Sequence, residues 1–236
     1  MSGAAALKKE TERTLSSLGL PVLQGYGMTE ASPVISVNPL SRPRRGTVGP
    51  PLPLMEARID CPDEAGVGEI VVRGPSVMAG YLDDPGETAA VLRDGWLHTG
   101  DLGFIGPKGY ITFAGRKKSV IVTAGGKNVY PDEIEMLLER SPFILECLVL
   151  AARDRKGNEQ VAAIVVPDYE AIAAGAVAAG PMSDEQVRHL ITAEVRAACA
   201  DLPEYKRVRE VRIRNEEFPK TSTRKIKRHL VKWPEE

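Results

Sequence analysis

Glycine and proline recur throughout residues 44–116, with only short runs of alternating or β-branched residues between them. Such runs occupy residues 56–60, 68–74 and 110–114. Because each glycine or proline interrupts a regular element, the segment predicts short strands joined by turns, arranged as a small barrel or a distorted sheet. Residues 85–93 have a composition compatible with helix and predict one short helix within this β-rich part.

The pattern changes after Gly115. Residues 119–123 predict a strand, and Gly125 and Gly126 predict the turn that follows it. Pro131 stands where the first position of a helix is expected. The next apolar residues have the spacing of one helix face and support this helix: Ile134, Leu137 and Leu138.

Two apolar runs, residues 144–151 and 160–166, flank a turn-forming segment and predict a β-hairpin. Ser183 and Gln186 have the spacing of a capping box, in which the serine caps a helix and the glutamine reaches back. The apolar face of that helix is expected to be Val187, Leu190, Ile191, Val195 and Ala198. Residues 208–213 predict a short strand, with a basic loop beyond it.

These elements predict an α+β fold with two domains. Residues 1–115 form a β-rich, distorted, barrel-like part, and residues 116–236 form a small α+β domain of ordinary size. The join is expected near residues 116–118. No run reaches the length of about 18 apolar residues that a membrane span needs, so no transmembrane segment is expected.

The three cysteines are far apart and odd in number. This spacing fits neither a zinc knuckle nor a disulfide framework, and it favours thiols in a reducing compartment. The sequence therefore predicts a cytoplasmic protein.

The net charge of −1 conceals a strongly basic tail. Residues 206–232 hold eleven Lys or Arg against three Glu, a local balance of +8, so the remaining residues sum to −9. A basic tail on an acidic body suits a polyanionic small molecule, a nucleic acid or a merely solvated surface. The most basic part of the tail, the loop at residues 219–228, has no interleaved aromatic residue, and Tyr205 and Trp233 stand at its edges. This disfavours a nucleic-acid partner.

The first motif is residues 24–30, Gln-Gly-Tyr-Gly-Met-Thr-Glu. Gly25 and Gly27 flank Tyr26, so the backbone can pass close to a flat ligand while the ring stacks on it. Thr29 offers a hydroxyl to a phosphate oxygen, and Glu30 offers a carboxylate suited to Mg²⁺. Taken alone, the segment equally fits a glycine-rich turn with a surface tyrosine.

The second motif is residues 95–103, which begin and end with glycine. Asp101, in a turn bounded by glycines, can accept hydrogen bonds from both hydroxyls of a ribose. An aspartate there also fits a residue that simply stabilises the turn. His98 is a candidate general base, although a packing or hydrogen-bonding role is the favoured interpretation.

The third motif joins Gly115-Arg116-Lys117-Lys118, the pair Gly125-Gly126, residues 131–135 and the basic loop 219–228. Small hydroxyls and point charges in such a loop can bind phosphate groups.

Together, in this order, the three motifs resemble the adenylate-forming superfamily of acyl-CoA synthetases, luciferases and peptide-synthetase adenylation domains. The resemblance extends over essentially the whole chain, including residues 2–7 and 68–81. Residues 25–33 and 219–228 are most similar to bacterial long-chain fatty acyl-CoA ligases. Most members of the superfamily have glycine where this chain has Arg224, which we interpret as a subfamily trait.

The resemblance implies a role for each matching residue. Tyr26 would stack on adenine, Thr29 would contact the α-phosphate and Glu30 would bind Mg²⁺. Asp101 and Arg116 would hold the ribose. The implied nucleotide-binding set is Gly25, Tyr26, Gly27, Thr29, Asp101, Arg116 and Lys225.

The resemblance also implies the reaction, in which a carboxylate and ATP give acyl-AMP and pyrophosphate, and a thiol then forms the acyl thioester. Thr29, Glu30 and Lys225 would be catalytic, with Lys225 bridging the carboxylate and the α-phosphate. Lys118 would be the hinge of the second domain. Gly125 and Gly126 would line the channel for CoA.

No segment matches the superfamily's triphosphate-binding loop, so the sequence predicts a truncated chain that begins within an enzyme and is itself inactive. The expected partners are the small molecules ATP, a fatty acid and CoA. The expected ligands are ATP or AMP, Mg²⁺ and CoA. Peripheral contact of the full-length enzyme with a membrane is left open. The alternatives are a non-catalytic nucleotide- or CoA-binding fragment, an adenylating enzyme that loads a carrier protein, and a basic nucleic-acid binder.

Overall fold

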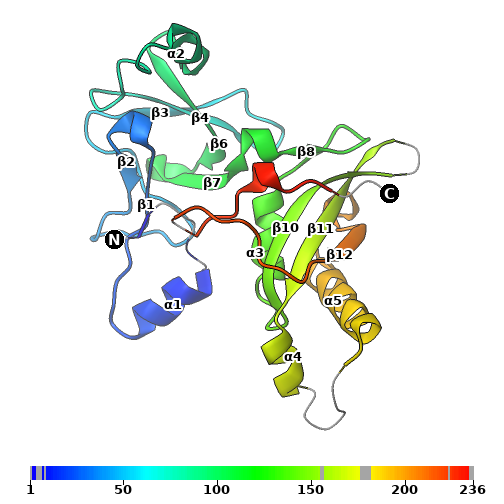
Figure 1. Cartoon of the computed structure of the whole chain (residues 1–236). Helices are drawn as coiled ribbons and strands as arrows, with labels where there is room; N and C mark the ends of the chain where they lie inside the picture. Colours follow the sequence, from blue (N-terminus) through cyan, green and yellow to red (C-terminus); the bar gives the residue numbers. More distant parts are fainter. Residues whose placement is uncertain are drawn as a thin grey trace. The chain divides into compact units, whose positions relative to one another are not determined.

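The computed structural model of the chain is shown in Figure 1. It describes residues 2–3, 7, 9–154, 157–175, 182–222 and 224–233. The chain divides into two compact units, Met1–Lys118 and Ser119–Glu236, which are described one at a time.

A five-stranded antiparallel sheet forms the centre of the first unit (Figure 1). The order is β3-β4-β6-β5, and β7 also pairs with β6. The strands are β3 (Glu56–Asp60), β4 (Gly68–Arg73), β5 (Leu92–Arg93), β6 (Trp96–Ile105) and β7 (Ile111–Arg116). As described, the sheet is open, so the distorted sheet rather than the barrel is observed.

The predicted helix of the first unit is α2 (Pro85–Val91). The side chain of Asp84 accepts a hydrogen bond from the backbone N–H of Glu87 and caps it. The helix stops before residue 93 because Leu92 and Arg93 form β5 and pair with β6. The other elements are α1 (Lys9–Ser17), β1 (Gly25–Gly27), η1 (Thr29–Ala31), β2 (Val34–Val37), η2 (Pro107–Gly109) and η3 (Lys117–Ser119).

One prediction for the first unit is wrong. Residues 95–103 are not a turn, because residues 96–105 form the strand β6. Burial alternates along the first part of β6: every second residue, Leu97, Thr99 and Asp101, is buried, and the residues between them are more exposed. This alternation is typical of a strand. Glycine does not end the strand, because Gly100 lies in an irregular part of it with φ of 69°. In the first motif, residues 25–27 form the short strand β1, and Thr29 and Glu30 belong to the short helix η1.

The second unit contains a three-stranded sheet in the order β10-β11-β12. The predicted hairpin is present, because β10 and β11 pair antiparallel; β12 runs parallel to β11. Figure 1 shows α5 beside this sheet. The elements are β8 (Ile121–Val122), β9 (Asn128–Val129), α3 (Pro131–Leu138), β10 (Ile144–Arg153), β11 (Glu159–Pro167), α4 (Tyr169–Gly175), α5 (Asp184–Ala198), η4 (Glu204–Lys206), β12 (Glu210–Ile213) and η5 (Arg228–Leu230).

Both faces of this sheet are covered. Val149 and Val165 face a core that also contains the apolar residues of α3 and α5. Leu148 and Ile164, one position away, face a second cluster with Phe218 and the apolar residues Ile226, Val231 and Trp233. Successive strand residues point to opposite faces, so covering both faces requires nearly continuous apolar runs, as observed at residues 144–151 and 160–166.

The capping box predicted for α5 is present. The Ser183 side chain accepts a hydrogen bond from the N–H of Gln186, whose side chain accepts one from the N–H of Ser183. Val187, Ile191 and Val195 are buried on the predicted face. The α+β fold class is therefore confirmed. Among the described residues, we find no helix with the length and apolar character that a membrane crossing requires.

Candidate functional site

Three predicted site residues of the first unit meet at one point. The hydroxyl of Tyr26 on β1 donates to Asp101 Oδ2 on β6 at 2.7 Å. Arg116 Nε on β7 lies 2.6 Å from Asp101 Oδ1, because the β6–β7 register places Asp101 opposite Arg116. The fold thus joins segments that are 75 residues apart in the chain.

The charges in this cluster suit recognition of hydroxyl groups. The Asp101 side chain is 3% exposed, whereas that of Arg116 is 58% exposed. Burial, and then the charge of Asp101, raise the pKa of the Tyr26 hydroxyl above its ordinary value, so Tyr26 stays a neutral donor. A carboxylate oxygen carries two lone pairs, so a carboxylate is able to accept hydrogen bonds from more than one donor.

Thr29 and Glu30 follow in η1. Thr29 is exposed, and Glu30 Oε1 accepts a hydrogen bond from the Tyr81 hydroxyl at 2.9 Å. The carboxylate of Glu30 is only partly buried and can still serve as a ligand for a hard cation. Gly27 has no room for a side chain, because an added Cβ would lie 1.8 Å from the carbonyl oxygen of Pro33.

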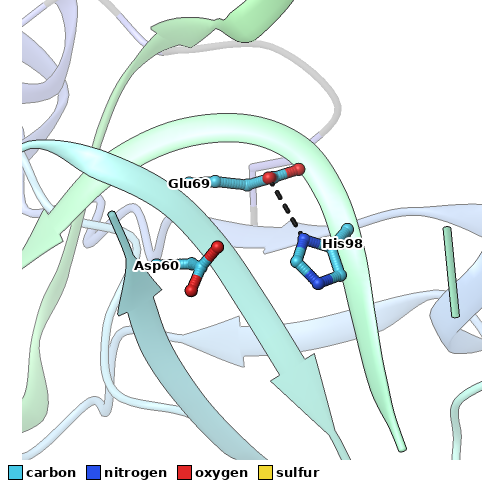
Figure 2. A group of neighbouring side chains, drawn as sticks. All are labelled: Asp60, Glu69 and His98. Atoms are coloured by element: carbon cyan, nitrogen blue, oxygen red, sulfur yellow. Dashed lines mark hydrogen bonds and ion pairs between the residues drawn. The ribbon is translucent and has the colours of Figure 1, made fainter. Parts of the chain in front are cut away.

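A second polar cluster lies on neighbouring strands of the sheet (Figure 2). Asp60, Glu69 and His98 place possible ligand atoms within 4.8 Å of one another. One imidazole with two carboxylates is a common ligand set for divalent metals. However, Glu69 Oε2 already accepts hydrogen bonds from Lys117 Nζ at 2.9 Å and from His98 Nδ1 at 3.2 Å. The charge of Lys117 balances the carboxylate, so the geometry favours an ion cluster over a metal centre.

His98 therefore has the hydrogen-bonding role that was the favoured interpretation. Lys118, the predicted hinge, lies in η3 with an exposed side chain. The unit boundary falls directly after it.

In the second unit, the basic loop closes on itself around Lys225. Lys220 and Ile226 form an antiparallel bridge, and Thr221 N–H donates to the carbonyl of Lys225 at 2.8 Å. The Lys225 side chain is exposed. Thr223 lies outside the described residues. Arg224 has φ of 61°, a left-handed conformation that costs a residue with a side chain about 1 kcal/mol, which explains why glycine suits this position.

Two glutamates anchor the ends of this loop, a role that the sequence motifs did not indicate. Glu146 on β10 forms an ion pair with Lys220 and accepts a hydrogen bond from Phe218 N–H at 2.9 Å. Glu135 on α3 is paired with Arg228. Glu135 and Arg228 both stand in the third motif, but their pairing depends on two segments 93 residues apart and has no local signal.

Gly125 and Gly126 form the turn between β8 and β9. Gly126 N–H donates to the carbonyl of Thr123 at 2.8 Å, and Gly126 has φ of 70°. Both glycines are exposed, and a Cβ added at either would meet no described atom within 4 Å. The two predicted glycines thus lie on an open surface of the second unit.

Comparison with known families identifies the chain. Residues 1–82 match the model of the AMP-binding enzyme family, and residues 133–225 match that of the AMP-binding enzyme C-terminal domain. The chain belongs to the AMP-binding enzymes.

Several AMP-binding enzymes are similar to this chain. A long-chain-fatty-acid–CoA ligase of Bacillus subtilis (strain 168) is 41% identical over 174 residues, covering 70% of this chain and 31% of the ligase. An indoleacetate–CoA ligase of Aromatoleum aromaticum is 41% identical over 173 residues, covering 70% of this chain and 34% of the ligase. This chain thus matches about a third of the length of these relatives.

A solved AMP-binding enzyme has the same fold over nearly the whole chain. The o-succinylbenzoate CoA synthetase of Bacillus subtilis, in complex with its acyl-adenylate intermediate, has a TM-score of 0.80 and 27% identity, covering 99% of this chain and 45% of the synthetase. The same synthetase with ATP and a magnesium ion has a TM-score of 0.76 and 28% identity, covering 96% and 44%.

Proposed function

We propose that this chain is the C-terminal part of an ATP-dependent acyl-CoA synthetase. The enzyme would join a carboxylate to ATP, giving acyl-AMP and pyrophosphate, and then transfer the acyl group to CoA. The observation that carries this proposal is the Tyr26–Asp101–Arg116 cluster, which combines a buried carboxylate with an exposed guanidinium. The similarity to several CoA ligases supports it.

In the first half-reaction, Asp101 would accept hydrogen bonds from the ribose hydroxyls, and Arg116 would donate to the same sugar. Tyr26 would hold the adenine and keep Asp101 oriented through its hydroxyl. Thr29 would donate to the α-phosphate. Glu30 would hold Mg²⁺, which neutralises phosphate charge when bound; a related synthetase has been solved with ATP and magnesium.

Lys225 would supply positive charge where the carboxylate attacks the α-phosphate, because negative charge develops there between two anions. Under this proposal, residues 1–115 are the end of the large AMP-binding domain, and residues 116–236 are the mobile domain that turns about Lys118. In the second half-reaction, the turn at Gly125 and Gly126 would leave room for the pantetheine arm of CoA.

We further propose a long-chain fatty acid as the acyl substrate. Residues 25–33 and 219–228 support it by their similarity to long-chain ligases, as does the Bacillus subtilis relative. The relatives that act on indoleacetate and o-succinylbenzoate show how widely the carboxylate varies within the family. We also infer a cytoplasmic location from the cysteine pattern.

The test is AMP binding by the purified 236-residue chain, measured by isothermal titration calorimetry. We expect saturable binding that Asp101→Ala abolishes, because the carboxylate is the acceptor for the ribose. Glu56→Ala, which removes an exposed carboxylate of the same sheet, should bind AMP as the wild type does. Absence of AMP binding by the folded wild-type chain, or equal binding by Asp101→Ala, would contradict the proposal.

A further inference from the structure

The strand β6 is irregular where it passes β4. Val71 of β4 pairs with His98 of β6, and Glu69 of β4 pairs with Leu102 of β6. The two pairs are therefore two positions apart along β4 but four positions apart along β6. Three residues of β6, Thr99 to Asp101, therefore lie opposite the single residue Ile70 of β4, so the residue proposed to read the ribose stands in a bulge. Bulges reorient side chains and leave backbone groups without their strand partners.

Glu69 and Thr99 supply partners to the bulge. Glu69 Oε1 accepts a hydrogen bond from Gly100 N–H at 3.0 Å. The Thr99 hydroxyl donates to the carbonyl of Ile70 at 2.7 Å and accepts from Asp101 N–H at 3.1 Å. The backbone on the N-terminal side of Asp101 is therefore held by side-chain groups instead of by the strand ladder.

The other oxygen of Glu69 reaches the next strand. Glu69 Oε2 accepts a hydrogen bond from Lys117 Nζ at 2.9 Å, and Lys117 directly follows Arg116. One carboxylate, 7% exposed, thus binds the residue before Asp101 and the residue after Arg116. This arrangement holds both members of the Asp101–Arg116 pair through their chain neighbours.

Glu69 is charged at neutral pH. Burial by itself would raise the pKa of Glu69, but hydrogen bonds from Lys117, His98 and Gly100 N–H outweigh it and hold the pKa below its ordinary value. The ionisable groups around Glu69 are Asp60 on β3, His98 on β6 and Lys117 in η3 (Figure 2 shows the first two).

We propose that Glu69 is a positioning residue that sets the Asp101–Arg116 pair for recognition of the ribose hydroxyls. This inference rests on the proposed nucleotide site and extends it to a residue that does not contact the nucleotide. Loss of the Glu69 charge frees Lys117 and leaves Gly100 N–H with a weaker acceptor. Asp101 and Arg116 then keep their chemistry but lose their fixed geometry.

The experiment measures the Kd of the 236-residue chain for AMP and for 2′,3′-dideoxy-AMP by isothermal titration calorimetry. The ratio of the two Kd values reports contacts to the ribose hydroxyls, because both probes carry the same base and phosphate. The wild-type chain should prefer AMP by about tenfold or more, as expected for hydrogen bonds to a charged acceptor. Glu69→Gln should reduce this preference to about twofold.

Two controls separate positioning from general damage. Glu56→Gln removes the same charge at an exposed ion pair of the same sheet and should retain the wild-type preference. Lys117→Met removes the other partner of the same ion pair, and because the Lys117 side chain is 61% exposed, this variant should fold. It replaces Glu69→Gln in the experiment if Glu69→Gln does not fold. It should also reduce the preference for AMP, and combining it with Glu69→Gln should add little, because the two residues act through one contact. Thermal unfolding checks that each variant is folded.

Each outcome is decisive. A folded Glu69→Gln chain with the full preference for AMP, together with an unaffected Lys117→Met chain, overturns the positioning role and leaves the nucleotide site intact. A wild-type chain that binds the two probes equally, or neither of them, overturns the ribose assignment of the proposed function, and the positioning role with it.

Discussion

At the scale of single residues, a largely buried carboxylate, that of Glu135, contributes to the stability of the second unit. Glu135 is 13% exposed and is held by Arg228 and by the backbone N–H of Val149, at 2.6 Å from the latter. Arg228 in turn donates to the carbonyl of Val149 at 3.1 Å. This network fixes the C-terminal end of the basic loop onto the sheet.

Arg228→Leu should destabilise the chain by about 3–5 kcal/mol near pH 8, because a buried carboxylate loses its charged partner. Urea unfolding measures the change. Arg209→Leu is the matched control, because it breaks an exposed ion pair with Glu204 and should cost less than about 1 kcal/mol.

The loss of stability caused by Arg228→Leu should also depend on pH. Burial raises the pKa of Glu135 to about 7 although Arg228 is present, and removal of Arg228 raises it further. The folded variant therefore binds a proton that the unfolded chain, with a glutamate pKa of about 4.3, has released. Stability of the variant then falls as pH rises from about 5 to about 8. The wild type loses stability in the same way up to its own Glu135 pKa of about 7. The penalty of Arg228→Leu should therefore be nearly constant from about pH 5 to about pH 7 and should grow as the pH rises above about 7. A penalty independent of pH would contradict this account of Glu135.

Substitutions at Lys225 and at Gly126 should each impair a different half-reaction of the full-length ligase proposed to contain this chain. Lys225→Ala should slow acyl-adenylate formation by about 100- to 1000-fold, because it removes charge stabilisation at the α-phosphate. Thioester formation from acyl-AMP and CoA should be nearly unchanged. Gly126→Leu should do the reverse, since a side chain would obstruct the thiol; its φ of 70° adds strain.

Single-turnover assays of each half-reaction distinguish these effects. Lys232→Ala removes another exposed lysine of the basic tail and is the control. Equal damage to both half-reactions by both variants would leave Lys225 as a general phosphate-binding or structural residue.

At the scale of elements, α5 shows how local sequence specifies a helix. Ser183→Ala should destabilise the second unit by about 1 kcal/mol, because the N–H of Gln186 loses its acceptor. Ser183→Asp should restore stability, since aspartate caps equally well and its charge suits the helix N-terminus. Urea unfolding of the three chains tests this, and equal stability of Ser183→Ala and the wild type would mean that the cap contributes nothing.

The elements also show where a local pattern misleads. Gly95, Gly100 and Gly103 predicted a turn because glycine usually ends regular structure. Instead, Gly100 takes up the bulge of β6, and Gly103 lies close to β7, where an added Cβ would be 2.3 Å from the carbonyl oxygen of Thr112. Glycine marks a close approach of two strands here, which only the pairing of β6 and β7 reveals.

At the scale of the whole molecule, the chain consists of two compact units that meet between Lys118 and Ser119. Limited trypsin digestion should cut first at Arg116, Lys117 or Lys118, because these exposed residues stand at the boundary. Mass spectrometry of the early fragments locates the cut. Earlier cleavage within residues 187–198, in the middle of α5, would contradict independent units.

The 236-residue chain should show no fatty-acid-dependent exchange of pyrophosphate into ATP, because no segment of it resembles the triphosphate-binding loop. The exchange assay with labelled pyrophosphate measures this directly. Robust exchange by the purified chain would show that the loop is not required, or that other residues replace it.

Much of this protein follows from the sequence by itself. Local patterns predicted the strand at residues 56–60, the strand at residues 68–74 (which ends at Arg73), the hairpin of β10 and β11, the start of α3 at Pro131 and the capping box of α5. The order of the three motifs indicated the family. Such signals are readable because periodicity, caps and turn residues act over a few positions of the chain.

The tertiary structure alone decided which residues support the site. Glu69 meets Gly100 and Lys117, and Glu135 meets Arg228, only because strands and helices distant in the chain are aligned in one register. In the sheet, a shift of one residue between paired strands would turn the Glu69 side chain to the opposite face. No local pattern encodes this alignment, since it results from the packing of whole sheets and helices.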